Sequence, residues 1–172
     1  MPRGSDAGRQ ATGFVVKLVV LTLLVGLGES QLHKMGWGHQ FQSTVARVSS
    51  RLAGLVSDRV TLDGNKIKGG LPLQVTIECT ALYATGLFLA AVIAFPCPWR
   101  ARLVGFVVGV VGVAAINIVR IAGLVLISIW NAKWFDFAHI VLMQGFLISC
   151  VAPLWLAWAM IVPKWFSRRR PG

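Results

Sequence analysis

The sequence predicts an all-α integral membrane protein with about four transmembrane helices, an outer amphipathic helix and a small β-hairpin. The first observation is composition: 56% of the 172 residues are hydrophobic and 13% are charged, against about 45–50% and 25% in soluble domains. The second is a mean hydropathy of +0.71, concentrated in long apolar runs. The third is that Lys and Arg flank these runs. Because the net charge of +11 is spread in this way, with no single basic face, it does not indicate a nucleic-acid partner.

Four segments are long and apolar enough to cross a bilayer, which requires about 20 mostly apolar residues in a helix. They are residues 14–32, 77–95, 103–130 and 140–162. We expect them to form a single membrane-embedded domain, with an inner tail at 1–13, an outer loop at 33–76 and an inner basic tail at 163–172.

The first of these segments is the weakest, because Glu29, Ser30 and Gln31 lie at its far end. A cleaved signal peptide is the alternative. The run Leu27–Gln31 is a poor cleavage site, however, so a retained helix is favoured.

The basic residues beside the spans predict the orientation. Lys and Arg precede the first span, lie between the second and third, and follow the fourth: Arg3, Arg9, Lys17, Arg100, Arg102, Lys164, Arg168, Arg169 and Arg170. By the positive-inside rule both termini lie inside, and residues 33–76 and 131–138 lie outside. The outer loop also contains Lys and Arg, so the signal is their density beside the spans.

The outer loop contains two predicted elements. Apolar residues recur at helical spacing and predict an amphipathic helix on the outer membrane surface: Phe41, Val45, Val48, Leu52, Leu55 and Val56. Residues 60–62 and 66–68 then flank Asp63-Gly64-Asn65, which predicts a β-hairpin. The third span has 28 residues and would be about 42 Å long, so we expect it to tilt or to project past the outer surface, with residues 121–130 packed beneath this helix and hairpin. The alternative is a break after Arg120. His33 and His39, at the start of the loop, are interpreted as solvated side chains.

Three chemically active side chains are predicted to share one depth at the outer face. Cys79 lies at the outer start of the second span, and His139 immediately precedes the fourth. Arg120 lies about 27 Å along the third span, near the outer edge of the hydrocarbon core. A thiol, an imidazole and a fixed cation are the groups needed for nucleophilic acyl transfer through a tetrahedral intermediate.

Each of these residues also has an ordinary structural interpretation. A cysteine by itself is more often a small core residue than a nucleophile, and Arg120 can snorkel to the headgroups. The presence of the other two groups favours catalysis for Cys79. Asn117, three residues before Arg120 on the same helix face, is expected to orient Arg120 or to bind the substrate backbone. Cys97 and Cys150 are too far from Cys79 to pair with it and are interpreted as structural.

Three neighbouring residues are secondary candidates. Glu78 is expected to pair with Arg120, to orient His139, or to be only an interfacial charge. Tyr83 either lines the site or is an interface aromatic. Asp136 is a weaker candidate for holding the imidazole.

Three short motifs resemble the exosortase/archaeosortase family of membrane transpeptidases. The family pattern is a Cys at the outer start of one helix, an Asn-x-x-Arg late in the next, and a His opening the one after. This chain has Glu78-Cys79-Thr80-Ala81-Leu82, Asn117-Ile118-Val119-Arg120-Ile121 and Phe137-Ala138-His139, in that order. The resemblance covers about residues 60–162. Most family members have about eight spans, so the chain is similar to compact members such as the H-type exosortases. It also departs from the usual Ser-Gly after the Cys, having Thr80-Ala81.

The resemblance implies a function. Cys79 would be the nucleophile, His139 the acid/base and Arg120 the transition-state stabiliser. The substrates would be proteins with a PEP-CTERM-like C-terminal sorting signal, made of a short motif, a transmembrane helix and a basic tail. A thioester intermediate would be resolved by water or by an amine or lipid-linked acceptor, at the outer (periplasmic) face of the bacterial inner membrane. Membrane lipid is a further expected partner; no cofactor, metal or nucleic acid is implied.

Other classes of membrane protein fit less well. The sequence has no HExxH, no GxSG and no paired intramembrane aspartates, the motifs of three other membrane protease classes. A transporter is disfavoured because almost no polar residues lie near the membrane midplane. The main alternative is a non-catalytic membrane subunit or scaffold.

Overall fold

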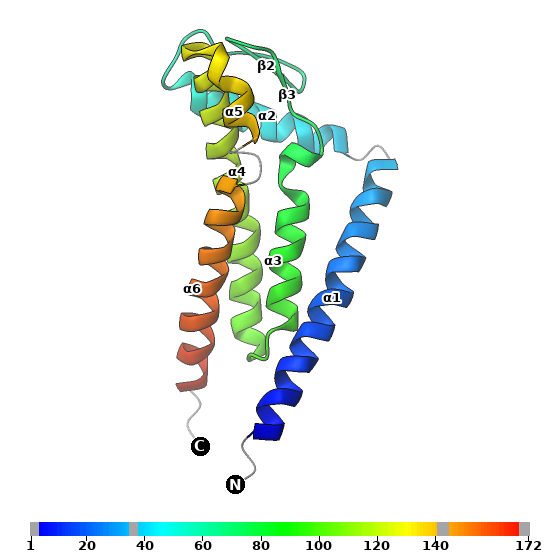
Figure 1. Ribbon diagram of the computed structural model, residues 1–172. Helices are drawn as coiled ribbons and strands as arrows, with labels where there is room; N and C mark the ends of the chain where they lie inside the picture. Colours follow the sequence, from blue (N-terminus) through cyan, green and yellow to red (C-terminus); the bar gives the residue numbers. More distant parts are fainter. Residues whose placement is uncertain (1–3, 35–37, 141–144, 169–172) are drawn as a thin grey trace.

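The computed structural model describes residues 4–34, 38–140 and 145–168 (Figure 1). In chain order its elements are α1 (Gly4–Lys34), α2 (Gly38–Gly54), β1 (Thr61–Asp63), β2 (Lys66–Lys68), β3 (Leu73–Gln74), the 3-10 turn η1 (Glu78–Thr80), α3 (Leu82–Ala94), α4 (Trp99–Trp130), the 3-10 turn η2 (Ala132–Trp134), α5 (Phe135–Ile140) and α6 (Leu147–Arg168). Helices α1, α3, α4 and α6 run side by side and are called the bundle. Across one end lie α2, the sheet, η1, η2 and α5, which are called the outer layer.

The predicted all-α membrane fold with an outer amphipathic helix and a small sheet is confirmed. Within the described residues, three helices are long and apolar enough to cross a membrane: Gly8–Gln31, Trp99–Trp130 and Leu147–Phe166. Helix α3 is apolar but has only 13 residues, a length of about 20 Å. It begins at Leu82 and not at Ile77, because the chain first forms η1 and then turns at Ala81, whose φ is 56°.

The last two helices also differ from their predicted limits. Helix α4 continues unbroken to Trp130, so the predicted alternative of a break after Arg120 is wrong. Helix α6 begins at Leu147 and continues through Pro163 to Arg168, whereas the span was predicted at 140–162. Residues 141–144 of that span lie outside the described residues.

Helix α4 is the centre of the bundle and packs against α2, α3, α5 and α6. Small residues allow this close approach, as is usual between membrane helices. A Cβ at Gly109 would lie 2.5 Å from Phe88 Cδ1 of α3. At the opposite end of the bundle from α2, Trp158 Nε1 of α6 donates a hydrogen bond to the carbonyl oxygen of Ala101 (3.1 Å).

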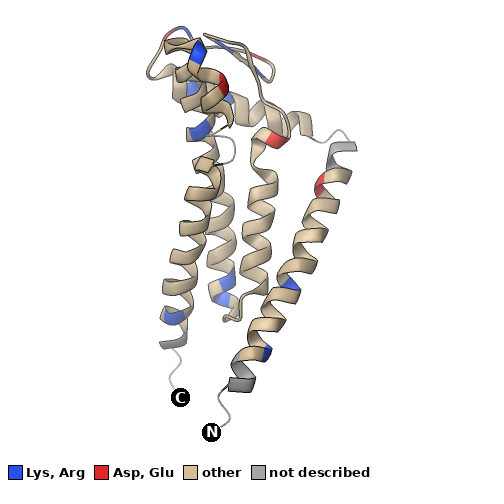
Figure 2. Ribbon diagram, viewed as in Figure 1, with Lys and Arg blue, Asp and Glu red and all other residues tan. Residues whose placement is uncertain are grey.

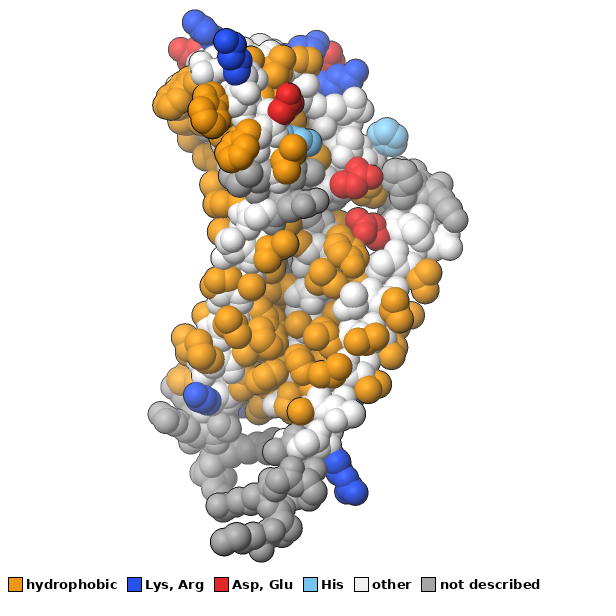
Figure 3. Space-filling view, viewed as in Figure 1, with side chains coloured by type: hydrophobic (Ala, Val, Ile, Leu, Met, Phe, Trp, Pro, Cys, Tyr) orange, Lys and Arg blue, Asp and Glu red, His pale blue; other side chains and the backbone are white. Residues whose placement is uncertain are grey.

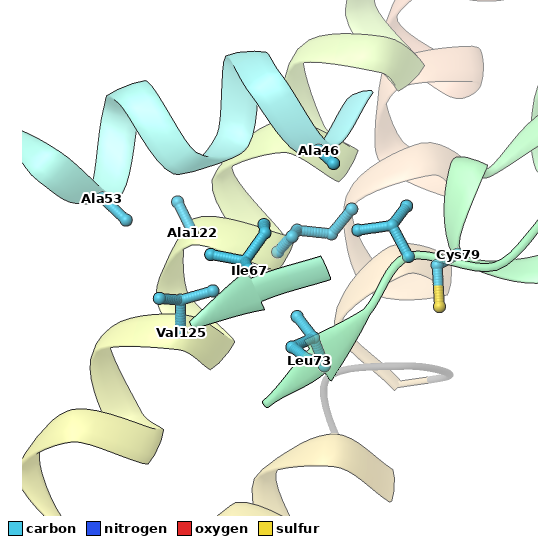
Figure 4. Packing of buried hydrophobic residues seen from close by; sticks show 9 residues of the cluster. Ala46, Ala53, Ile67, Leu73, Cys79, Ala122 and Val125 are labelled. Atoms are coloured by element: carbon cyan, nitrogen blue, oxygen red, sulfur yellow. The ribbon is translucent and has the colours of Figure 1, made fainter. Parts of the chain in front are cut away.

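The outer layer has its own hydrophobic core, built on the last turns of α4. Ile67 and Leu73 of the sheet pack there with Ala46 and Ala53 of α2 and with Ile121, Ala122 and Val125 of α4 (Figure 4). The predicted packing of the end of α4 beneath the amphipathic helix and hairpin is therefore confirmed.

Helix α2 packs against α4 and the sheet mainly through small residues. Of the apolar residues predicted for its membrane-facing stripe, Val45 packs against this core. The buried residues of α2 are Ala46, Ser49, Ser50 and Ala53. The predicted apolar residues Phe41, Val48, Leu52 and Leu55 are exposed. Small side chains allow the backbones of α2 and α4 to approach closely, so the apolar stripe is left for contact with the membrane surface.

The hairpin forms as predicted, and a third strand joins it. β1 pairs with β2 in the register Thr61↔Lys68 and Asp63↔Lys66, and Gly64 takes the left-handed conformation in the turn (φ 61°). The additional strand, β3, pairs with the other edge of β2. Gly70 fixes the sheet to α4, because a Cβ there would clash with the backbone of Ser128.

Charged residues lie mainly at the two ends of the molecule (Figure 2). Arg100 and Arg102 begin α4 at the end opposite the outer layer, whereas Asp63, Glu78 and Asp136 belong to the outer layer. Between the ends, one face of the bundle is covered with hydrophobic side chains (Figure 3). This distribution suits a protein whose middle section lies in lipid.

Candidate active site

The chain that leads to Cys79 alternates between buried and exposed side chains. Leu73, Val75, Ile77 and Cys79 are buried, while Gln74, Thr76 and Glu78 are exposed. The segment then tightens into η1, where the Cys79 amide donates to the Thr76 carbonyl oxygen at 3.1 Å. As a result, the thiol is held at the junction of the outer layer and the bundle.

The Cys79 side chain is only 9% exposed and contacts a hydroxyl group. The Oγ1 atom of Thr76 lies 3.5 Å from Cys79 Sγ in hydrogen-bonding geometry. Thr76 was not predicted as a site residue.

Asn117 attaches the Cys79 turn to α4. Its Nδ2 atom donates a hydrogen bond of 2.8 Å to the Cys79 carbonyl oxygen, and the residue is 1% exposed. No described residue donates a hydrogen bond to the buried Oδ1 atom of Asn117. One side of this amide therefore positions the backbone of Cys79.

Arg120 lies one helical turn beyond Asn117 and is 3% exposed. Its guanidinium group lies close enough to Cys79 for the two residues to interact electrostatically. The two residues of the Asn-x-x-Arg motif thus both face the Cys79 segment from the same side of α4.

Ala81, two residues after Cys79, has a left-handed backbone conformation (φ 56°, ψ 24°). Its carbonyl oxygen accepts hydrogen bonds from both the amide and the hydroxyl of Thr85. A residue with a Cβ adopts this conformation at a cost of about 1–2 kcal/mol. The conformation gives a physical reason for glycine at this position of the family pattern, and for the abrupt start of α3.

His139 lies in α5 and is half-buried. Its ring stacks on Phe135, with centroids 5.7 Å apart and an interplanar angle of 13°. Phe135 packs against the cluster that contains Cys79 and Ile121. Among the described residues no hydrogen bond joins His139 to Cys79, so the structure brings Cys79, Asn117 and Arg120 together and connects His139 to them through Phe135.

Two of the three secondary candidates, Tyr83 and Asp136, are not joined to Cys79, Asn117 or Arg120 by a described contact. Tyr83, in the first turn of α3, and Asp136, in the first turn of α5, are exposed. Neither makes a hydrogen bond or ion pair within the described parts of the chain. Glu78 is exposed beside Cys79 and lines the pocket described next.

A polar pocket of about 420 Å³ lies beside the Cys79 segment. Its lining residues come from the start of α2, the hairpin turn and the chain before Cys79: Gly38, His39, Gln42, Asn65, Gln74, Thr76, Ile77 and Glu78. His39 is exposed at the pocket wall. Sequence reasoning missed this pocket, although the strand-like alternation of residues 73–79 was a signal that the second span begins later than Ile77.

No group of three or more His, Cys, Asp or Glu side chains suited to hold a metal ion occurs in the described part of the chain. The side chains at the site offer a thiol, a guanidinium group, an amide and an imidazole.

Together, the apolar bundle and the polar site at its end define a multi-pass membrane protein with a cysteine-centred site. A family model described as transmembrane exosortase matches residues 7–158, and the chain belongs to this family. The match begins earlier than the predicted resemblance and includes α1 and α2. No curated protein and no solved structure matches the chain.

Proposed function

We propose that the protein is a cysteine protease/transpeptidase that cleaves C-terminal, PEP-CTERM-like sorting signals at the outer face of the bacterial inner membrane. Membership of the exosortase family suggests a membrane transpeptidase of protein sorting. The observation that carries the proposal is the attachment of the Cys79 turn to the Asn-x-x-Arg motif of α4.

In the proposed reaction, Cys79 thiolate attacks the carbonyl carbon of the scissile peptide bond. The carbonyl oxygen becomes an oxyanion, which the Arg120 guanidinium group stabilises with its charge and its directed donors. The carbon–nitrogen bond then breaks, and His139 protonates the departing amine. The resulting thioester is attacked by water or by an amine or lipid-linked acceptor, which releases the thiol.

The position of His139 supports this role indirectly. Its stacking on Phe135 fixes the imidazole ring beside the cluster that contains Cys79. Catalytic hydrogen bonds are often longer or absent before substrate binds, and substrate is the component that would join the two groups.

The bundle offers a place for the transmembrane helix of a substrate. An apolar groove of about 400 Å³ lies between α3 and α6. Its first α3 residue, Ala84, is less than two turns from Cys79 along the chain. A helix in this groove would hold the peptide that precedes it near the thiol.

The second candidate function is a non-catalytic membrane subunit or scaffold. The observation that favours it is that Asn117 hydrogen-bonds a backbone carbonyl, a contact that also serves to fix helix packing. In that case Cys79 would be a small packing residue.

The distinguishing experiment is co-expression of each variant with a reporter protein that ends in a PEP-CTERM-like sorting signal. We expect Cys79→Ala to abolish cleavage, because no nucleophile remains, and His139→Ala to block release of the leaving amine. Cys97→Ala and Cys150→Ala are the matched controls and should process the reporter normally. The measurement is the ratio of full-length to shortened reporter on a gel, with membrane insertion checked for every variant. Normal cleavage by Cys79→Ala would establish the scaffold as the better account.

A further inference from the structure

The pocket beside Cys79 is distinct from the apolar groove in the bundle. It is formed within the outer layer by three separate segments, which are the first turns of α2, the hairpin turn and residues 74–78. A hydrogen bond from Asn65 Nδ2 to Gln42 Oε1 (3.3 Å) joins two of its walls. A second, from Asn65 Nδ2 to the Val75 carbonyl oxygen (3.1 Å), joins the hairpin to the third wall. The pocket therefore has a cross-linked frame.

The lining is suited to peptide. Gln74 provides a primary amide with two donors and an acceptor. The hydrogen bonds of the frame use Asn65 Nδ2 and Gln42 Oε1, so Asn65 offers its Oδ1 acceptor and Gln42 its Nε2 donors, and Thr76 adds a hydroxyl. These are the complements of the alternating N–H and C=O groups of a polypeptide backbone. A volume of about 420 Å³ lies within the range of small-ligand sites, about 300–1,000 Å³.

The long wall of the pocket has the repeat of an extended chain. Gln74 and Thr76 are alternate residues that both line it, and alternate residues in an extended strand are separated by about 6.6 Å. Glu78, the first residue of η1, lines the end of this wall. This wall continues β3, which is an edge strand because the sheet order is β1-β2-β3. Edge strands are common docking sites for extended peptides.

The pocket also leads directly to the nucleophile. Thr76 lines the pocket and is the residue whose hydroxyl contacts Cys79 Sγ. A peptide that lies along residues 74–78 therefore lies beside the hydroxyl that contacts the thiol.

We propose that this pocket binds the extended, polar peptide segment on the acyl side of the scissile bond, and so selects the sequence that Cys79 cleaves. The inference rests on the proposed function. The pocket belongs to the outer layer, where the part of a substrate outside the membrane would lie, whereas the apolar groove between α3 and α6 suits the part within it.

The test uses the full-length protein in detergent micelles and three alkylating probes. Two are acetylated tripeptidyl chloromethyl ketones, one with Asn and Gln side chains and one with Leu and Val side chains. The third is iodoacetamide, which has no peptide. In each reaction the thiolate forms a bond to the methylene carbon of the reagent and halide leaves. Mass spectrometry of digested protein measures the rate at Cys79 separately from Cys97 and Cys150.

We expect the polar tripeptide to alkylate Cys79 at least tenfold faster than the apolar tripeptide. Gln74→Ala, at an exposed position, should reduce the rate with the polar tripeptide about threefold to tenfold, the effect of losing one hydrogen bond. Gln42→Ala should do the same. The rate with iodoacetamide should not change in either variant, because the thiol itself is unaltered. Gln40→Ala, an exposed glutamine of α2 outside the pocket, is the matched control and should behave as wild type.

Four results would overturn the inference. Equal rates with the polar and apolar tripeptides would show that the pocket does not select polar sequence. A parallel loss of reactivity toward iodoacetamide in both pocket variants would show an effect on the thiol and not on peptide binding. Failure of all three probes to alkylate Cys79 would refute the proposed function as well, whereas alkylation without any dependence on Gln74 or Gln42 would refute only the assignment of the pocket.

Discussion

The outer layer and the bundle of the same chain are stabilised in different ways. In the outer layer, apolar side chains such as Ile67 and Val75 are buried, each 1% exposed, as in a small soluble protein. The bundle also buries apolar side chains at its centre, such as Phe88 and Val113. Its helix α1 has the reverse arrangement: it exposes Val15, Val19 and Leu23, and its apolar window has no buried residues.

The difference follows from the surroundings of each region. Water drives apolar side chains into a core, but lipid is as apolar as leucine, so membrane helices associate through close packing of small residues instead. Helix α4 belongs to both regions: its Gly105 and Gly109 lie against side chains of the bundle, whereas its buried Ile121 and Val125 lie in the core of the outer layer. The catalytic candidates are found at the boundary between the two.

The largest expected effect tests the chemistry at this boundary. Arg120→Lys keeps the positive charge and loses the planar fork of donors. If Arg120 stabilises an oxyanion by directed hydrogen bonds, cleavage of the reporter should fall by about two or more orders of magnitude. The initial rate of reporter cleavage is the measurement. If Lys restored nearly normal cleavage, Arg120 would be only a structural or headgroup cation.

The second prediction compares large-to-small substitutions in the two regions. Ile67→Ala removes a buried side chain from the core of the outer layer and should lower the free energy of unfolding by about 2–5 kcal/mol. Val19→Ala, on the lipid-facing surface of α1, is the control and should have little effect. Unfolding in mixtures of a mild detergent and a denaturing surfactant measures the free energy of unfolding of both variants. If both variants lost the same free energy of unfolding, the distinction between the two regions would be contradicted.

The third prediction concerns small-to-large substitutions within α4. Gly109→Ala places a methyl group against Phe88, which is 2% exposed, and should cost about 1–3 kcal/mol of stability. Gly123→Ala is the control, because no atom lies within 4 Å of the added Cβ. It should be neutral or stabilising by up to about 1 kcal/mol, as expected for Gly to Ala in a helix. Thermal unfolding in detergent distinguishes the two variants, and a Gly109 variant as stable as wild type would refute close packing of α3 on α4.

The smallest expected effect is at the turn that joins the two regions. Ala81→Gly removes the cost of a Cβ in the left-handed conformation and should raise the free energy of unfolding by up to about 1 kcal/mol. Ala84→Gly, in the regular helix that follows, should lower it by about 0.5–1 kcal/mol. A shift of the melting temperature in the same direction for both variants would contradict the observed backbone conformation.

Much of the fold could be predicted from the sequence because it depends on local patterns. Long apolar runs require helices in lipid, and Asp63-Gly64-Asn65 between short strands requires a tight turn. The order of the Cys, Asn-x-x-Arg and His motifs indicated the family. The spacing of Asn117 and Arg120 placed both on one helix face, and this holds in the structure. The helices, the tight turn and the shared helix face each depend on residues within about ten positions of one another along the chain.

Other features were decided only by the tertiary structure. The start of α3 depends on the backbone of Ala81, and the buried face of α2 on the fit of Ala46 and Ala53 to α4. The hydrogen bond from Asn117 to Cys79 joins residues 38 positions apart. The polar pocket assembles side chains from α2, the hairpin and the chain before Cys79, none of which has a recognisable motif by itself. The physical reason is that hydropathy and turn preference act locally, whereas packing and long-range hydrogen bonds depend on which distant segments meet.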